Sequence, residues 1–530
     1  MKKLCLSLIA LAMIQWSIAQ TYQNPILPGF HADPSICRAG DYYYLVNSTF
    51  EYFPGVPIHR SKDLVNWELV GHVVTRNSQL DMEGYKASAG IHAPTIRYHQ
   101  GTFYVVFTNI SFKGIENLLF TADSTMSRWS DAITITQGRP WGIDPDIFFD
   151  DDGKCYFMTN RKHPGKEPYR KYREIAVQEL DLNTMELVGE TWIIGSGNVK
   201  GATSTEGPHL YKKDGLYYLI VAEGGTGTNH AVTISSSESI SGPYEPCPYN
   251  PILTHRFMQK NIELRNLGHA DLVQTPEGDW WMVFLGVRYK TSNKPFTGRE
   301  TFLVRVDWSR KYPVVNPGYS QVQYTYPLPE GVESQYRSDV FIDDFSDGSP
   351  DLSWTCLRAA NDFAVVTPKN ELKIALQPST ISELTSPSFL GKRVESASFD
   401  AEIDLRLDKL KEGEEVGMVL LADNEDFVKM VFTKSNLRLV ESENTEVKVL
   451  KKVSYEGKDH KLIFRLRDQR LSAYFQKADG ELVSLGVDLE AKSLSNYRYT
   501  GLFVGPYGSS NGQKTKTAFY VKRFEYANED

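Results

Sequence analysis

The sequence predicts an all-β protein, with a five-bladed β-propeller followed by a β-sandwich of the jelly-roll kind. Two patterns support this fold class. In the C-terminal part of the chain, apolar and polar side chains alternate, as they do from Phe399 to Leu407, and a period of two is typical of a half-exposed sheet. In the N-terminal part, a turn glycine followed by an aromatic, β-forming run recurs five times, at Gly40, Gly101, Gly153, Gly215 and Gly278.

The five glycines predict five similar units. Their spacings are 61, 52, 62 and 63 along the chain, and each glycine separates two short apolar runs, which indicates a hairpin. Units of roughly this length suffice for a four-stranded sheet with generous loops, and five such sheets around an axis form a β-propeller. A β-sandwich with accidental regularity is the alternative. Because no long stretch has the helical period of 3.6, we expect few helices.

Each predicted hairpin is introduced by a segment that carries an acidic residue or a histidine. In a propeller the first strand of each blade lines the central channel, so we expect these side chains to gather at one mouth of it. Charged groups are rarely buried without a partner or a purpose. The five segments are His31-Ala32-Asp33, His92-Ala93-Pro94, Asp144-Pro145-Asp146, Glu206-Gly207-Pro208 and His269-Ala270-Asp271.

A stretch rich in proline and glycine, from Pro313 to Gly331, indicates a connector between two domains. We therefore place the propeller at residues 20–335 and the sandwich at residues 336–530.

The segment from Met1 to Ala19 has the features of a secretory signal peptide. Two lysines precede an apolar stretch from Leu4 to Ile14, and small residues at Ser17 and Ala19 end the segment. This apolar run is too short to span a bilayer, which takes roughly 20 residues. We expect cleavage after Ala19 and export to the periplasm or the medium.

The charge balance narrows the possible partners. The net charge is −8 and the isoelectric point is about 5.9. Nucleic-acid binding requires clustered Lys and Arg, so this balance argues against a nucleic-acid partner and suits a neutral substrate. No later segment is apolar enough to span a membrane. The remaining cysteines lack metal-ligand spacing, and either free thiols or disulfides are compatible with Cys37, Cys155, Cys247 and Cys356.

Three carboxylates of the introductory segments suit the cleavage of a glycosidic bond. This reaction needs one acid that protonates the leaving oxygen, and one base or nucleophile. Several carboxylates in one dry cavity raise the pKa of at least one of them by repulsion and desolvation. The alternative is structural: Asp33 and Asp144 would cap turns before a proline, and Glu206 would be a surface acid at a strand end.

The same segments resemble the signature motifs of glycoside hydrolase family 43. The resemblance covers nearly all of the chain after the signal segment, and the C-terminal part is similar to the concanavalin-like sandwich of the β-xylosidase and arabinofuranosidase branch. The motifs are His31-Ala32-Asp33-Pro34-Ser35, Tyr52-Phe53-Pro54-Gly55-Val56-Pro57, Ala93-Pro94-Thr95-Ile96-Arg97-Tyr98, Gly142-Ile143-Asp144-Pro145, Thr205-Glu206-Gly207-Pro208-His209, Gly268-His269-Ala270-Asp271-Leu272 and Gly298-Arg299-Glu300-Thr301-Phe302.

The resemblance implies an exo-acting, inverting hydrolase that releases a terminal pentose from plant hemicellulose or its oligosaccharides. Arabinofuranose is favoured, and β-D-xylose or both sugars are the alternatives. It further implies that Asp33 is the general base, that Glu206 is the general acid, and that Asp144 raises the pKa of Glu206 and orients it. The base and the acid are then expected about 6.5–9.5 Å apart, with room for a water.

Further roles follow from the resemblance alone. Arg288 is expected to bind a sugar hydroxyl near the acid, with a surface arginine as the alternative. Phe53 and Tyr52 are expected to wall the sugar subsite, with a packing role as the alternative for Tyr52. His92 is also expected to contact the substrate, and it stands where relatives often carry another aromatic residue. His269 either joins a calcium ion on the propeller axis, held mainly by waters because calcium prefers oxygen ligands, or is a core histidine without metal. The chemistry needs no cofactor.

The role of the sandwich has two interpretations. It is either a carbohydrate-binding module or a domain that packs on the propeller and narrows the active-site mouth, and the resemblance favours the second. A propeller that binds sugar without catalysis is the rival from another class of function. Release of a chromophore from an aryl arabinofuranoside or xyloside would separate that rival from an enzyme.

Overall fold

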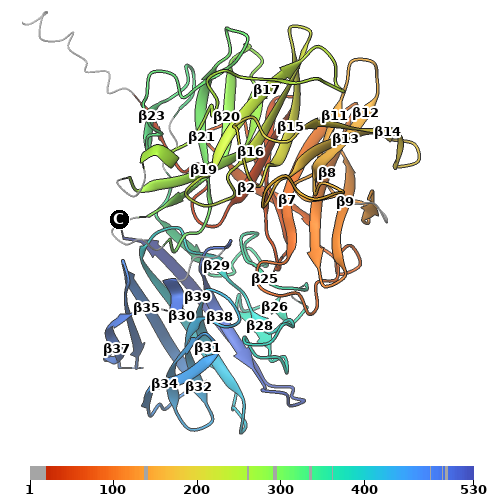
Figure 1. Ribbon diagram of the computed structural model, residues 1–530. Helices are drawn as coiled ribbons and strands as arrows, with labels where there is room; N and C mark the ends of the chain where they lie inside the picture. The colour runs from red at the N-terminus through yellow and green to blue at the C-terminus, as the bar shows by residue number, and fades with distance from the viewer. Residues whose placement is uncertain are drawn as a thin grey trace, which may run out of the picture.

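The computed structural model is nearly all-β and has two domains, so the predicted fold class is confirmed (Figure 1). Outside its strands, the described chain contains two short 3-10 segments, Arg256–Met258 and Ser493–Ser495. The predicted signal segment and the domain boundary at residues 335 and 336 lie outside the described residues. The structure describes residues 20–136, 141–258, 262–289, 295–333, 337–360, 362–477, 479–491, 493–495 and 499–529.

Five four-stranded antiparallel sheets form the propeller, and the strands of each sheet follow one another in chain order, except that β4 (Tyr52–Phe53) lies between the second and third strands of the first sheet. They are β2 (Ala32–Ala39), β3 (Tyr42–Ser48), β5 (Gly55–Ser61) and β6 (Glu68–Val74); β7 (Gly90–His99), β8 (Thr102–Ser111), β9 (Gly114–Asp123) and β10 (Ile133–Thr134); β11 (Asp146–Phe149), β12 (Cys155–Arg161), β13 (Glu174–Asp181) and β14 (Glu186–Gly195); β15 (Glu206–Lys213), β16 (Leu216–Glu223), β17 (Ala231–Ser237) and β18 (Glu245–Pro246); β19 (Leu264–Gln274), β20 (Trp280–Arg288), β21 (Glu300–Asp307) and β22 (Val314–Val315).

The first strands of the five blades meet around the axis. β2 contacts both β7 and β19, and β15 contacts both β11 and β19, so the ring of inner strands closes between the fifth blade and the first. All five predicted turn glycines lie between the first two strands of a blade, with φ between +59° and +96°. A residue with a Cβ adopts this left-handed conformation with difficulty, which explains why each of these hairpin turns contains a glycine.

A kink occurs at the mouth end of every inner strand. One residue there has a left-handed backbone: Asp33, Ala93, Asp144, Gly207 and His269, with φ of 51°, 42°, 57°, 57° and 48°. In four of the five blades the strand pairing also shifts register at or next to this residue. Bulges re-aim side chains near active sites, and left-handed non-glycine residues cost free energy that the surrounding structure must supply. The repeated kink therefore marks the functional end of the propeller.

Two further sheets form the C-terminal sandwich. Its core-facing side chains follow the predicted alternation: Phe399, Ile403 and Leu405 of β30 are buried, and the polar residues that alternate with them are partly exposed. One sheet contains β24 (Val340–Asp343), β26 (Ala364–Val366), β27 (Leu372–Ala375), β30 (Ser398–Leu407), β35 (Asp459–Arg467), β36 (Arg470–Gln476), β37 (Leu482–Glu490) and β39 (Ala518–Asn528). The other contains β28 (Ser388–Phe389), β29 (Lys392–Arg393), β31 (Glu415–Leu421), β32 (Phe427–Thr433), β33 (Leu437–Glu443), β34 (Glu446–Val453) and β38 (Phe503–Ser509).

The sandwich lies directly against the propeller (Figure 1). Strand β4 (Tyr52–Phe53) of the propeller pairs with β25 (Cys356–Leu357) of the sandwich, and one apolar core extends across both domains. A short two-stranded sheet, β1 (Thr21–Gln23) with β23 (Thr325–Pro327), ties the start of the propeller to the connector. Because the interface includes strand pairing and a shared core, we expect the two domains to move as one unit.

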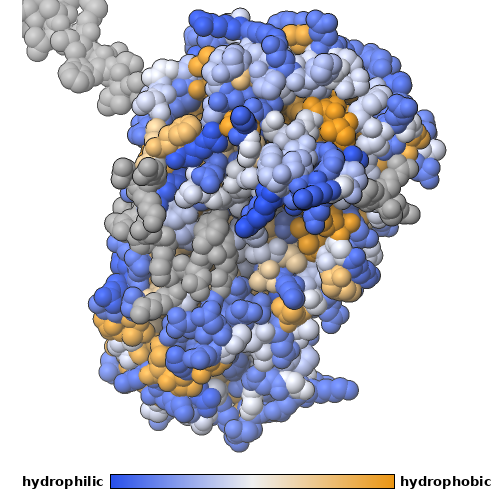
Figure 2. All heavy atoms as spheres, viewed as in Figure 1, coloured by the Kyte–Doolittle hydropathy of each residue, from blue (hydrophilic) through white to orange (hydrophobic). Residues whose placement is uncertain are grey.

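Hydrophilic residues predominate on the face of both domains that Figure 2 shows. In the described ranges no helix is long and apolar enough to cross a membrane. The four cysteines that follow the predicted signal segment are buried free thiols in the structure: Cys37, Cys155, Cys247 and Cys356.

Candidate active site

Side chains from four blades converge around His269. Its Nδ1 atom lies 3.8 Å from Oδ1 of Asp33 and 3.9 Å from Oδ2 of Asp144. The fourth blade reaches the same imidazole, because a Cβ built on Gly207 would lie 3.1 Å from it, and Gly207 directly follows Glu206. The structure thus brings the three predicted carboxylates to one mouth of the channel, although they come from three different blades and lie far apart in the chain.

Asp33 is held in its ionised form. Ser48 donates a hydrogen bond to its Oδ2 at 2.7 Å, and Arg299 binds its Oδ1 at 2.7 Å. Burial alone would raise the pKa of Asp33, but Arg299, His269 and the Ser48 hydroxyl outweigh burial and keep this pKa below its ordinary value. A carboxylate in this state accepts protons and does not donate them.

Asp144 and Glu206 are shifted in the opposite direction. Burial, together with repulsion from Glu206 and Asp33, raises the pKa of Asp144 well above its ordinary value. Burial and repulsion from Asp33 raise the pKa of Glu206 to about 7. The Asp144–Glu206 pair therefore retains a proton near neutrality, next to a carboxylate that does not.

The arginine that binds Asp33 is Arg299, whereas Arg288 is engaged by a buried glutamate. Both guanidinium nitrogens of Arg288 that face Glu300 bind its carboxylate, at 2.6 and 2.8 Å, and Nη2 also donates to the carbonyl of Glu395. Arg288 is thus engaged in a structural pair with a fully buried glutamate. Arg299 stands in the Gly298-Arg299-Glu300 motif, so the sequence contained the signal for it.

The predicted aromatic walls also need correction. Tyr52 is fully buried and stacks on Phe503 of the sandwich at a centroid distance of 4.0 Å. Phe53 is buried in the shared core, and its carbonyl accepts a hydrogen bond from the Cys356 thiol. Both side chains pack between the domains because β4 pairs with β25, so neither walls a sugar. Two aromatic rings lie beside Arg299 instead, those of Phe50 and Tyr499, at 5.5 and 5.4 Å from its guanidinium carbon.

His92 lies at the site as its position predicted. Its ring is 4.4 Å from the ring of Phe50, and its Nδ1 lies 3.0 Å from the Gly90 carbonyl. Burial lowers the pKa of His92 to about 4, so the imidazole is neutral. Because a carbonyl only accepts, Nδ1 carries the proton.

The sandwich contributes to the same mouth. The carbonyl of Tyr499 accepts a hydrogen bond from Nε of Arg299 at 3.1 Å, and its ring stacks over Phe50 at 6.1 Å. A Cβ at Gly298 would lie 2.6 Å from the backbone of Gly501, so the two loops touch. The sandwich therefore holds the arginine that binds Asp33, in agreement with the interpretation that it narrows the mouth. No local pattern in the sequence points to Tyr499.

Below the three carboxylates, a guanidinium occupies the propeller axis. Arg97 of the second blade binds Asp146 at 2.9 Å and Asp271 at 2.8 Å, and both carboxylates are fully buried. Ser35 and Tyr211 donate further hydrogen bonds to Asp271, at 2.7 and 2.5 Å. All five inner strands take part in this network, which we call the axial network: Ser35, Arg97, Asp146, His209, Tyr211 and Asp271.

The axial network does not fit a calcium ion beside His269. Calcium requires six to eight oxygen ligands, and the axial carboxylates of Asp146 and Asp271 already bind Arg97. The two histidines near the axis, His269 and His209, have only nitrogen atoms as possible metal ligands. Within the described residues, no cluster of three His, Cys, Asp or Glu is arranged to hold a metal. The positive charge on the axis thus belongs to the chain itself.

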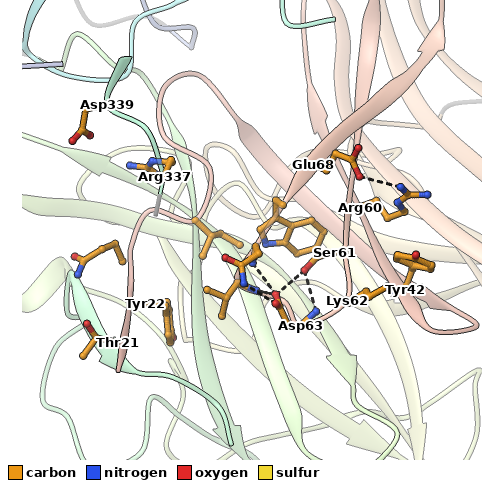
Figure 3. Close-up of a pocket in the computed structure, with 15 residues that line it drawn as sticks. Thr21, Tyr22, Tyr42, Arg60, Ser61, Lys62, Asp63, Glu68, Arg337 and Asp339 are labelled. Atoms are coloured by element: carbon orange, nitrogen blue, oxygen red, sulfur yellow. Dashed lines mark hydrogen bonds and ion pairs between the residues drawn. The ribbon is translucent and has the colours of Figure 1, made fainter. Parts of the chain in front are cut away.

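A separate hollow of about 950 Å³ lies at the opposite end of the first blade (Figure 3). It is lined by Tyr42, the first residue of β3, and by Ser61, the last residue of β5, whereas Asp33 lies at the other end of that sheet. An Arg60–Glu68 ion pair of 2.9 Å borders it. None of the three carboxylates lines this hollow, so size alone does not identify the site.

Comparisons with known proteins agree with this geometry. Residues 22–312 match the sequence profile of glycosyl hydrolases family 43, and residues 342–527 match that of the beta xylosidase C-terminal concanavalin A-like domain. The chain is 39% identical over 503 residues to a xylosidase/arabinosidase of Butyrivibrio fibrisolvens, and the match covers 92% of this chain and 96% of that protein. It is 36% identical over 526 residues to a non-reducing end alpha-L-arabinofuranosidase of Bacteroides ovatus, with 96% of each chain covered.

Solved structures extend the likeness to both domains. The crystal structure of a xylan beta-1,4-xylosidase from Bacillus halodurans superposes with a TM-score of 0.87 at 33% identity, and the match covers 96% of this chain and all of that one. The family profile spans more than half of the chain, and the relatives match nearly its full length. The chain therefore belongs to glycoside hydrolase family 43 and is a glycoside hydrolase.

Proposed function

We propose that the protein is an exo-acting, inverting hydrolase that releases a terminal pentose from plant hemicellulose, foremost α-L-arabinofuranose. The names of similar proteins support a pentose, since they include arabinofuranosidases, xylosidases and enzymes named for both. β-D-Xylose is the second candidate on the same grounds. The lysines and the apolar run between Met1 and Ala19 support export.

The observation that carries this proposal is the opposite shift of two neighbouring pKa values. Asp33 has a lowered pKa, and the pKa of Glu206 is raised to about 7. Titratable groups whose environments push their pKa values apart are the usual acid and base assignments of a hydrolase. A propeller that only bound sugar would need no such pair.

In the proposed reaction, Asp33 takes a proton from a water while the water oxygen attacks the anomeric carbon. The bond from that carbon to the leaving oxygen breaks, and Glu206 gives its proton to the leaving oxygen. The configuration at the anomeric carbon is inverted by this single displacement. Asp33 then releases its proton to solvent, and Glu206 takes one up. Burial and repulsion from Asp33 keep the pKa of Glu206 high, Asp144 orients Glu206, and Arg299 keeps Asp33 ionised and in place.

The pH dependence of kcat/KM is predicted from these shifts. Glu206 must be protonated, so activity is present at low pH and is lost as the pH rises through about 7. Asp33 must be ionised, so its lowered pKa moves the acid limb below the ordinary range of an aspartate. A pH–rate profile on an aryl pentoside measures both limbs. Full activity well above neutrality would contradict the protonated state of Glu206.

Product analysis tests the proposed function directly. The protein is expected to release pentose from 4-nitrophenyl α-L-arabinofuranoside, from the β-D-xylopyranoside, or from both. Proton NMR during turnover should show the first-formed anomer with inverted configuration. Hexosides serve as the control panel. Release of hexose but no pentose, or retention of configuration, would refute the proposal.

A further inference from the structure

A strongly basic loop lies beside the proposed acid. It connects β12 to β13 in the third blade and spans residues 162–173 (Figure 1). From Arg161 to Arg173 the sequence contains six Lys and Arg residues and one Glu, although the net charge of the whole chain is −8. Such a concentration of positive charge has no counterpart in the neutral pentose that the site is proposed to release.

Two hydrogen bonds attach this loop to the segment that leads into Glu206. The Tyr169 hydroxyl donates to the carbonyl of Ala202 at 2.8 Å, and the amide of Ser204 donates to the carbonyl of Lys171 at 2.8 Å. Ser204 is two residues before Glu206, so the loop is fixed on the side of the acid. In agreement with this placement, Arg173 and Lys171 act on the pKa of Glu206, which they lower against the larger effect of burial.

Most of the positive charge of the loop is free to meet a ligand. Arg161 pairs with Glu174 at 3.1 Å and Arg173 with Glu167 at 2.8 Å. Four further cations are exposed, and none of them forms an ion pair with any residue that the structure describes: Lys162, Lys166, Arg170 and Lys171. The solvated loop therefore presents unneutralised charge next to the mouth.

The position of the loop determines which part of the substrate it can contact. The general acid protonates the oxygen that leaves with the aglycone, which is the part of the substrate released from the pentose. The aglycone therefore lies on the side of Glu206 during the reaction. Clefts lined by one sign of charge concentrate ligands of the opposite sign. Building on the proposed function, we propose that residues 162–173 select substrates whose aglycone carries a carboxylate, such as a uronic acid side group near the pentose.

The size of the effect follows from the exposure of the cations. An exposed ion pair contributes little, so each cation is expected to change kcat/KM by roughly two- to fivefold. Screening by salt reduces this contribution, because the Debye length falls from about 10 Å at 0.1 M to about 3 Å at 1 M. Selectivity for an acidic aglycone should therefore diminish as salt is added.

The test compares two arabinoxylo-oligosaccharides that differ only in one glucuronic acid side group. The native protein is expected to hydrolyse the acidic one faster at low salt. The double variant Lys166→Gln/Arg170→Gln removes two exposed cations of the loop and should lose this preference, with kcat/KM on the acidic substrate reduced about four- to twenty-fivefold and kcat/KM on the neutral one nearly unchanged. The matched control is Lys451→Gln/Lys452→Gln, which removes two exposed cations from β34 of the sandwich.

Three results decide the proposal. Equal rates of the native protein on the two oligosaccharides overturn it, as does a preference that survives in the loop variant or disappears in the control. Failure to release pentose from either substrate is a failure of the proposed function instead. In that case calorimetric binding of the acidic oligosaccharide to Glu206→Gln, with and without the loop substitutions, still reports on the loop.

Discussion

Replacing Glu206 with glutamine is expected to lower kcat on native oligosaccharides by about 10²- to 10⁴-fold, the usual contribution of a general acid. Glutamine keeps the shape of the side chain but has no proton to give to the leaving oxygen. Sugar binding should persist, because glutamine has nearly the same size and shape as glutamate and the rest of the site is unchanged. The measurement is kcat on an arabino-oligosaccharide, together with calorimetric binding of the same ligand.

A second glutamate provides a matched control. Burial raises the pKa of Glu51 to about 7 as well, but this residue accepts a hydrogen bond from the amide of Ser88 between the domains. Glu51→Gln is therefore expected to retain kcat. In Glu206→Gln, aryl substrates with good leaving groups should suffer less than native ones, because they need less protonation. Undiminished turnover of native substrate by Glu206→Gln would show that Glu206 is not the general acid.

Replacing Arg97 with methionine is expected to destabilise the propeller by about 3–5 kcal/mol, the range found when one partner of a buried ion pair is removed. Asp146 and Asp271 would remain in the core without the guanidinium that binds both. Asp33 and His269 lie on inner strands, and Asp144 lies two residues before one, so all three would lose the common tie of these strands. A displacement of about 1 Å at an active site can cost about 10²-fold in rate. Urea unfolding and kcat are the measurements.

Two milder variants distinguish an effect on the position of the site from simple misfolding. Tyr211→Phe removes only the hydroxyl that binds Asp271 in the axial network. Tyr217→Phe removes an equivalent hydroxyl in the same blade, bound to Asp150 at 2.6 Å and away from the axis. We expect kcat to fall in the first variant and to hold in the second. Equal kcat in both would show that the axial network does not position the site.

The axial network also predicts the response to chelators. Because Arg97 supplies the positive charge on the axis, EDTA should leave the kcat and the melting temperature of the native protein unchanged. A loss of either on chelation, restored by calcium, would contradict the conclusion that the axis does not fit a calcium ion.

The sequence by itself determined the repeat, the fold class and the identity of the three carboxylates. Its hairpin glycines were sufficient because a tight left-handed turn is a local property of the chain. Asp33, Asp144 and Glu206 were recognisable for a related reason: each stands a short distance before such a glycine, so local spacing places it at the mouth. Arg299 was within reach too, since it lies in a motif that the sequence displayed.

Only the tertiary structure decided which neighbours these carboxylates have. Tyr52 and Phe53 were expected at the sugar and instead pack between the domains, because β4 pairs with β25, a strand of the other domain. The same holds for Tyr499, which reaches Arg299 from the sandwich, and for Arg97 between Asp146 and Asp271. Contacts between distant segments depend on how whole sheets dock and on which charges burial brings together, and no local spacing in the chain encodes that.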